Sequence, residues 1–207
     1  MAVAIPERTG ARVMTAKRGR LIALDGSAVG LTAAAKDVAR ALAAADVPRG
    51  VSPWDASGIF TELFAGGPAV RVPSARTLTL LYAADLAFRL RWQIVPALAE
   101  GRCVIAAPYV ETAKAVALAA GLPRKWLVEL FRFAPRPDGA YHVTQRSHPA
   151  AAARSYFECF STTLERSDVQ FDDIRTRARE YLASLERGRR FRRLTAAALT
   201  TVARQRG

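Results

Sequence analysis

The sequence is poor in the features that cross-link a protein or carry it into a membrane. Its two cysteines, Cys103 and Cys159, lie far apart and lack the spacing of metal ligands. We expect both to be buried free thiols in a reducing cytoplasm. No apolar run approaches the ~20 residues that span a bilayer, so we predict no membrane partner. The first 20 residues lack the apolar core of a secretory signal. We predict a flexible basic tail over residues 1–19 and one domain over residues 20–207.

Histidine is equally scarce, with His142 and His148 as its two occurrences. No Ser-His-Asp or Cys-His arrangement can be assembled from these positions, so we predict no catalytic residue and no metal site. His142 lies in an apolar run and is expected to be a hydrogen-bonded core residue. His148 precedes a proline and is expected in an exposed loop.

Acidic residues are outnumbered, 18 against 31 basic ones, which gives a formal net charge of +13. Such a balance is compatible with an anionic partner such as nucleic acid. The basic residues are spread along the chain and accompanied by heavy alanine usage, so we favour compositional bias over a dedicated nucleic-acid function. The basic run Arg187–Arg193, with Phe191 inside it, is either a contact for nucleic acid or an acidic partner, or a solvated helix end. We favour the helix end.

The chain contains a regular alternation of short apolar runs and helical patterns. Runs at residues 21–24, 103–107 and 140–144 have the length of buried strands, and a further extended piece leads into residues 51–54. Helical patterns cover residues 32–45, 57–64, 75–100, 111–120, 123–133, 149–164 and 171–186. Pro96 is expected to kink or divide the longest helix, and residues 194–202 fit either a strand or a helix. This alternation predicts an α/β fold with a parallel sheet and helices on both faces.

The first turn of the chain has the layout of a phosphate-binding loop. An apolar strand is followed by Gly26, Ser27, Gly30 and Thr32, and then by a helical pattern. Glycines let backbone N–H groups turn toward an anion, and a helix N-terminus favours negative charge. The lysine of such loops is missing, because Leu31 precedes Thr32, and Asp25 stands where the first glycine is expected. We predict a vestigial phosphate-binding site, or else an inherited tight turn in which Asp25 repels phosphate.

The order of segments over residues 19–204 resembles that of the thymidylate kinases, a branch of the P-loop nucleoside monophosphate kinases. The long helical stretch carries the strongest likeness, in Leu80–Leu86 (LLYAADL) and Ile94–Gly101 (IVPALAEG). Weaker likenesses lie in Asp25–Thr32, Val104–Tyr109, Arg136–Val143 and Phe171–Leu182. Scaffold residues match better than residues with a chemical role.

The resemblance implies a three-layer α/β/α P-loop NTPase fold with a mostly parallel sheet. For an active member it implies ATP-dependent phosphoryl transfer to dTMP, with Mg²⁺ as cofactor. It also implies a homodimer through the helix Leu78–Leu98. Tyr82, Asp85 and Tyr109 match positions beside the acceptor nucleotide, so we predict a residual nucleoside pocket there and a nucleotide as its ligand. An ordinary core aromatic is the other interpretation of Tyr82.

The departures from this family fall where its chemistry lies. Leu31 takes the place of the loop lysine, Ser52 that of an acidic residue before a proline, and Leu86 that of an arginine that contacts the acceptor. Ala107 and Pro108 take the place of the Asp-Arg pair that organises metal and phosphate. Val143–Arg146 takes the place of the acids that end a later strand. Phosphoryl transfer depends on placed cations and Mg²⁺. We therefore expect neither ATP nor Mg²⁺ as a cofactor, and an inactive binding or regulatory homologue.

Two alternatives stay open at this point. An active dTMP kinase would use ATP and Mg²⁺ with displaced cations, for which Lys36, Arg49 and Arg76 are the candidates. A basic nucleic-acid-binding protein on the same fold would account for the net charge of +13.

Overall fold

The computed structural model describes residues 18–27, 30–65, 73–144, 171–188 and 190–195, together with the single positions 156, 160, 198 and 201. The tail predicted over residues 1–19 and the helix predicted over residues 149–164 lie largely outside these ranges. So do Cys159 and His148. In the described part of the chain, no helix is both long and apolar enough to cross a membrane.

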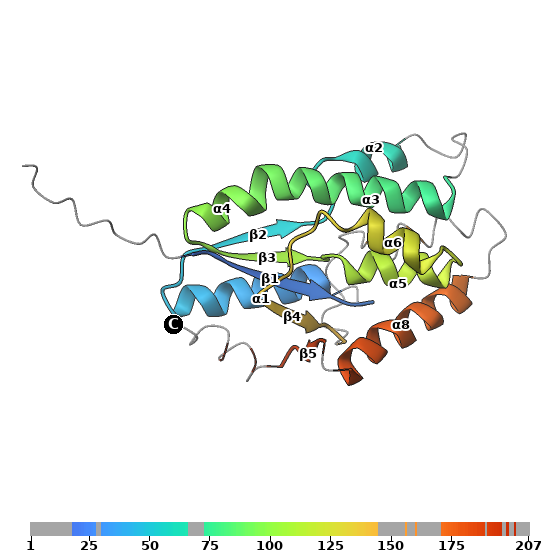
Figure 1. Cartoon of the computed structure of the whole chain (residues 1–207). Coiled ribbons are helices and arrows are strands. Elements are labelled where there is room, and N and C mark those ends of the chain that lie inside the picture. The colour runs from blue at the N-terminus through green and yellow to red at the C-terminus, as the bar shows by residue number, and fades with distance from the viewer. Residues whose placement is uncertain are drawn as a thin grey trace, which may run out of the picture.

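A five-stranded sheet forms the centre of the molecule (Figure 1). Its strands are β1 (Arg20–Asp25), β2 (Arg49–Pro53), β3 (Cys103–Ala107), β4 (Gly139–His142) and β5 (Arg192–Arg193). They are arranged in the order β2-β3-β1-β4-β5, and every neighbouring pair is parallel. β1 and β3 are interior strands, so both of their faces are covered, and Leu21–Leu24 of β1 and all of β3 are apolar. The predicted parallel α/β sheet is confirmed.

Helices cover both faces of this sheet. Alternate side chains of β1 point to opposite faces. Ile22 and Leu24 pack with α1 (Leu31–Ala44). Leu21 and Ala23 share the larger core with most of the remaining helices. These are α2 (Ile59–Ala65), α3 (Ala75–Arg89), α5 (Glu111–Ala119), α6 (Arg124–Leu130) and α8 (Phe171–Arg187). The result is a three-layer α/β/α arrangement, consistent with a P-loop NTPase.

The long helix predicted over residues 75–100 is divided as Pro96 suggests. α3 passes into a π-helical turn, η1 (Leu90–Ile94), and then into the short α4 (Val95–Ala99). A proline has no N–H to donate, and its ring clashes with the carbonyl four residues earlier. The wider π turn lies immediately before Pro96, where this clash would otherwise occur.

The basic run after α8 differs from the expected solvated helix end. α8 ends at Arg187, and Arg192–Arg193 form β5, the edge strand beside β4. These two arginines form a strand because they pair with Tyr141 and His142 of β4, a tertiary contact. Leu194 donates its N–H to the His142 carbonyl, which extends the pairing by one residue.

Candidate functional site

The phosphate-like loop lies where β1 ends and α1 begins, at the carboxyl edge of the sheet. Of the four residues predicted there, Gly26 and Ser27 follow β1, and Gly30 and Thr32 flank the first residue of α1. The first turn of α1 has no acidic residue, and the Gly30 cap has no side-chain hydrogen bond. Its backbone N–H groups therefore retain the partial positive charge of a helix N-terminus.

Leu31, at the position of the missing lysine, belongs to the core. Its side chain is buried against the α1 face of the sheet, in a cluster with Leu24, Val38 and Ala107. A lysine there could not reach a phosphate from this packing without leaving the cluster. The structure thus shows an aliphatic core residue where an active loop needs a cation.

Asp25 ends β1 as a fully buried carboxylate. Its Oδ1 accepts hydrogen bonds from the Tyr109 N–H (3.0 Å), the Thr112 N–H (2.9 Å) and the Thr112 hydroxyl (2.8 Å). It therefore caps the first turn of α5, a helix that lacks a side-chain cap from its own Val110. Burial raises the pKa of Asp25 from 3.8 to about 6, although the bonds from Thr112 act in the opposite direction. Oδ2 is buried and has no hydrogen-bond partner among the described residues.

Gly26 is required by close packing at the base of the loop. A Cβ on Gly26 would lie 2.4 Å from the carbonyl oxygen of Val143, a backbone atom that cannot move aside easily. The Gly26 N–H donates to the Thr112 hydroxyl at 3.0 Å. The loop is thus tied to the same residue of α5 that Asp25 caps.

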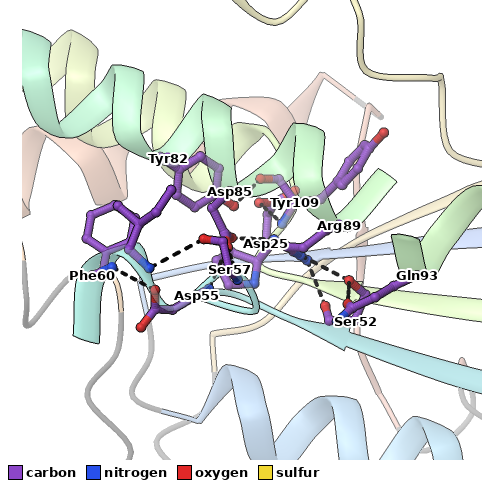
Figure 2. Close-up of polar contacts among 12 residues, drawn as sticks. Asp25, Ser52, Asp55, Ser57, Phe60, Tyr82, Asp85, Arg89, Gln93 and Tyr109 are labelled. Carbon is purple, nitrogen blue, oxygen red and sulfur yellow. Dashed lines mark hydrogen bonds and ion pairs between the residues drawn. The ribbon is translucent and has the colours of Figure 1, made fainter. Parts of the chain in front are cut away.

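A buried network of charged and polar groups lies on the α3 side of this edge (Figure 2). Asp85 Oδ1 accepts from the Ser57 N–H (3.0 Å) and hydroxyl (2.8 Å), and its Oδ2 accepts from the Asp55 N–H (3.0 Å). The Arg89 guanidinium lies one helical turn away, with Nη1 3.9 Å from Asp85 Oδ2. Both charged side chains are fully buried.

Arg89 binds the ends of two strands to α3. Its Nε donates to the Ser52 hydroxyl (3.0 Å), and its Nη2 donates to the carbonyls of Ser52 (2.7 Å) and Pro108 (3.0 Å). The Ser52 hydroxyl donates onward to Gln93 Oε1 at 2.7 Å. Ser52 and Pro108 are two of the residues at which the sequence departs from the kinase resemblance, and Arg89 hydrogen-bonds to both.

The residues of the predicted nucleoside pocket are brought together but are buried. The Tyr82 hydroxyl donates to the Tyr109 carbonyl, and the Tyr109 hydroxyl donates to the Pro135 carbonyl at 2.7 Å. The Tyr82 ring packs edge-on against Phe131 and Tyr156. Burial raises the pKa of both Tyr82 and Tyr109, so both phenols are neutral at ordinary pH. A nucleobase would have to displace these neighbours to stack on Tyr82.

Sequence reasoning missed most of the buried contacts around Asp25 and Asp85. Thr112, Arg89, Asp55 and Gln93 were not singled out, although each makes a buried or half-buried hydrogen bond there. One signal was available, since Arg89 follows Asp85 at the i,i+4 spacing on the helix face that carries Tyr82. An arginine on that apolar face needs a buried acceptor.

The candidate substitute cations do not converge on the loop. Arg49 begins β2 and is level with Cys103 and Arg20, at the amino edge of the sheet. Asp25 lies five residue steps farther along β1 than Arg20, which places the loop about 17 Å along the strand direction from Arg49. This distance is longer than an arginine side chain reaches. Lys36 is exposed on α1, and the Arg76 guanidinium lies over the Trp126 ring at 5.0 Å.

Other titratable groups are engaged in structural contacts. His142 is a buried core residue, as predicted, and its Nδ1 lies 3.0 Å from Glu186 Oε2. Cys103 is a buried free thiol, as predicted, and burial raises its pKa to about 11. Within the described ranges, no group of three or more His, Cys, Asp or Glu residues could hold a metal ion.

Comparisons with known proteins give local matches to three archaeal proteins named "Probable thymidylate kinase". The identities over 59 residues are 46% for Pyrococcus horikoshii, 44% for Pyrococcus abyssi and 46% for Thermococcus gammatolerans. No protein-family model matches the chain. Each match covers 28% of this chain and 28–29% of the relative, so the chain spans less than a third of the length of the curated relatives it matches. The chain is therefore similar, in part, to thymidylate kinases.

Proposed function

We propose that this protein is a thymidylate-kinase-like homologue that has lost phosphoryl transfer and acts as a binding or regulatory protein. The parallel sheet and the loop between β1 and α1 support the relationship, together with the local identity of about 45% to probable thymidylate kinases. The proposal concerns the loop and the acceptor side of the same sheet edge.

One observation carries the loss of activity: the side chain at the loop's lysine position is buried in the core. Leu31 is 5% exposed, and the buried carboxylate of Asp25 lies at the base of the same loop. A phosphate on the loop would meet an anion instead of a cation. Losing one preorganised stabiliser typically slows a reaction by ~10²–10³, and here the Asp-Arg pair after β3 is replaced as well.

The test is turnover and binding with the purified chain. Incubation with ATP, Mg²⁺ and dTMP, followed by ³¹P NMR, is expected to give no dTDP above a protein-free control. Calorimetry with millimolar ATP and Mg²⁺ is expected to show no heat of specific binding. Turnover at ordinary kinase rates, ~1–100 s⁻¹, would contradict the proposal and support an active kinase.

We also propose a homodimer that buries the exposed stripe of the long helix. Leu80, Phe88, Trp92 and Val95 are 38–64% exposed and follow one another at helical spacing along α3, η1 and α4. A second copy of this stripe would cover them. Trp92→Glu is expected to yield a monomer in analytical ultracentrifugation. The matched control Val128→Glu, at an exposed apolar residue on α6, is expected to leave the dimer intact. A monomeric wild-type chain would contradict this proposal.

A further inference from the structure

The basic run Arg187–Arg193 has no part in the function proposed above. Five of its seven residues are arginine and none is acidic. Residues 187–207 together hold seven arginines and no acidic residue, which amounts to more than half of the net charge of +13. A compositional bias acts on the whole chain and would spread the excess charge evenly. It does not explain this concentration.

The fold holds the backbone of the basic run in place. The Arg190 N–H donates to the Leu185 carbonyl of α8 at 3.1 Å. The Phe191 side chain is buried, and Arg192–Arg193 pair with β4 as β5. A backbone that is already ordered loses less conformational entropy when its side chains bind a partner. The arginines are therefore presented by a fixed support.

The arginine side chains of the basic run are exposed and little neutralised. The four that the structure describes are all exposed: Arg187, Arg190, Arg192 and Arg193. Among the ion pairs of described residues, one involves the run, between Arg193 Nε and Glu186 Oε1 at 3.6 Å. The other three guanidinium groups are therefore available to an outside partner.

The basic run lies at one edge of the sheet. β5 is the outer strand beside β4, and Figure 1 shows it at the opposite edge from β2. Charged side chains on an edge strand also discourage unwanted pairing with other chains. That role concerns the two residues of β5, and it does not account for Arg187 and Arg190, which lie outside the strand.

The chemistry of the basic run fits the phosphate backbone of a nucleic acid duplex. Guanidinium groups bind phosphate through paired N–H donors, and a duplex presents phosphates at close, regular spacing. The one aromatic residue of the run, Phe191, is buried and is not available to stack on the bases of a single strand. The exposed residues described in the run include no apolar side chain that could enter a membrane surface.

We propose that the basic run is a binding surface for the phosphate backbone of duplex nucleic acid, with Arg187, Arg190 and Arg192 as its contacts. Contacts to phosphate carry no base information, so this binding is independent of nucleotide sequence. The proposal does not depend on the loss of phosphoryl transfer or on the state of the loop between β1 and α1.

The experiment is a fluorescence anisotropy titration of a labelled DNA duplex of mixed sequence with the full chain, repeated over a series of salt concentrations. Each phosphate contact to a duplex contributes about −0.9 to the slope of log affinity against log salt. Three contacts therefore predict a slope at least as steep as about −2.7. A single strand of the same length and poly-glutamate are expected to bind more weakly than the duplex.

Replacing the three contacts is expected to remove their share of the salt dependence. The triple variant Arg187→Ala, Arg190→Ala, Arg192→Ala should flatten the slope by about 2.7, whereas lysine at the same three positions should preserve it. Arg187→Ala alone, outside β5, should flatten the slope by about 0.9. Urea unfolding of each variant checks that the fold is retained.

The matched control removes three exposed arginines from other parts of the molecule, so that the net charge falls by the same amount. Arg40 lies on α1, Arg49 begins β2 and Arg102 precedes β3. Replacing these three by alanine is expected to leave the slope unchanged. Equal flattening in both triple variants would show that net charge binds the duplex, and would overturn the proposal.

Three other results would overturn it as well. They are a slope near zero in the unaltered chain, tighter binding of the single strand, and equal affinity for poly-glutamate, which would indicate an acidic protein partner. Production of dTDP from ATP and dTMP would contradict the proposed function instead, and it would leave the duplex-binding surface standing.

Discussion

The two faces of the sheet differ in the side chains that they carry at its carboxyl edge. On the α1 face Leu31 packs in an aliphatic cluster. On the opposite face Asp85 and Arg89 are charged, but both are fully buried and bonded to the chain itself. One face is thus aliphatic at this edge, whereas the other holds buried charges that hydrogen-bond within the chain. Four changes test this contrast, beginning with the largest expected effect.

Removing the buried guanidinium is expected to cost the most. Arg89→Met leaves the Asp85 carboxylate without its cation and strands the carbonyls of Ser52 and Pro108. Breaking a buried pair in this way typically costs about 3–5 kcal/mol in the free energy of unfolding. Urea unfolding measures the loss. The control Arg91→Met removes an exposed arginine that lies over Trp92 and should cost below about 1 kcal/mol. Similar costs for both variants would refute the structural role of Arg89.

Restoring the loop lysine is expected to harm the α1 face. Leu31→Lys removes an aliphatic side chain from the cluster with Val38 and Ala107 and directs an ammonium group toward it. We expect a loss of about 3 kcal/mol in urea unfolding and no gain in ATP binding by calorimetry. Thr32→Lys, at the next and half-buried position, serves as the control and should cost less than about 1 kcal/mol. Restored ATP binding in Leu31→Lys would show that the loop kept its function.

Asp25 should make stability depend on pH. Its folded pKa of about 6 lies above the usual 3.8, so the folded state holds the proton more tightly. Its contribution is therefore fully present below about pH 4 and is lost as pH rises through 6, by up to about 3 kcal/mol. Urea unfolding at pH 4, 5, 6 and 7 measures this slope against Asp25→Asn, in which this component should disappear. A wild-type slope equal to that of the variant would argue against a raised pKa.

The smallest effect is expected at the hydroxyl that joins the loop to α5. Thr112→Val removes the bond to Asp25 Oδ1 and the acceptor for the Gly26 N–H while keeping the side-chain volume. We expect a loss of about 1–2 kcal/mol, measured by urea unfolding. Thr77→Val, at an exposed residue of α3, is the control and should be nearly neutral. If Thr112→Val were equally neutral, the hydrogen bonds between the loop and α5 would contribute nothing to the free energy of unfolding.

The sheet was largely predictable because its interior strands are covered on both faces. The apolar runs within β1 and β3 are short, and a buried strand is the structure that such runs predict. β5 was not predictable, because Arg192–Arg193 have no apolar pattern and owe their strand to pairing with β4. Tertiary pairing of this kind leaves no local signal in the sequence.

The candidate site was predictable in position but not in its contacts. Glycine spacing indicated the loop from Gly26 to Thr32, and the structure places it at the end of β1. The bonds from Asp25 to Tyr109 and Thr112 join residues more than 80 positions apart, so no local pattern indicated them. The burial of Arg89 was hidden for a related reason: its acceptors belong to Ser52 of β2 and to Pro108, directly after β3, both distant in the sequence.

The bond from Thr112 to Asp25 also has a consequence for the order in which the chain matures. The two residues lie 87 positions apart, and at ~5–20 residues per second a ribosome needs roughly 4–17 s to add that length. Until then β1 has emerged without the amides that hold its last residue. The end of the first strand is thus completed late, and the phosphate-like loop cannot take its final form before β3 and the start of α5 have been synthesised.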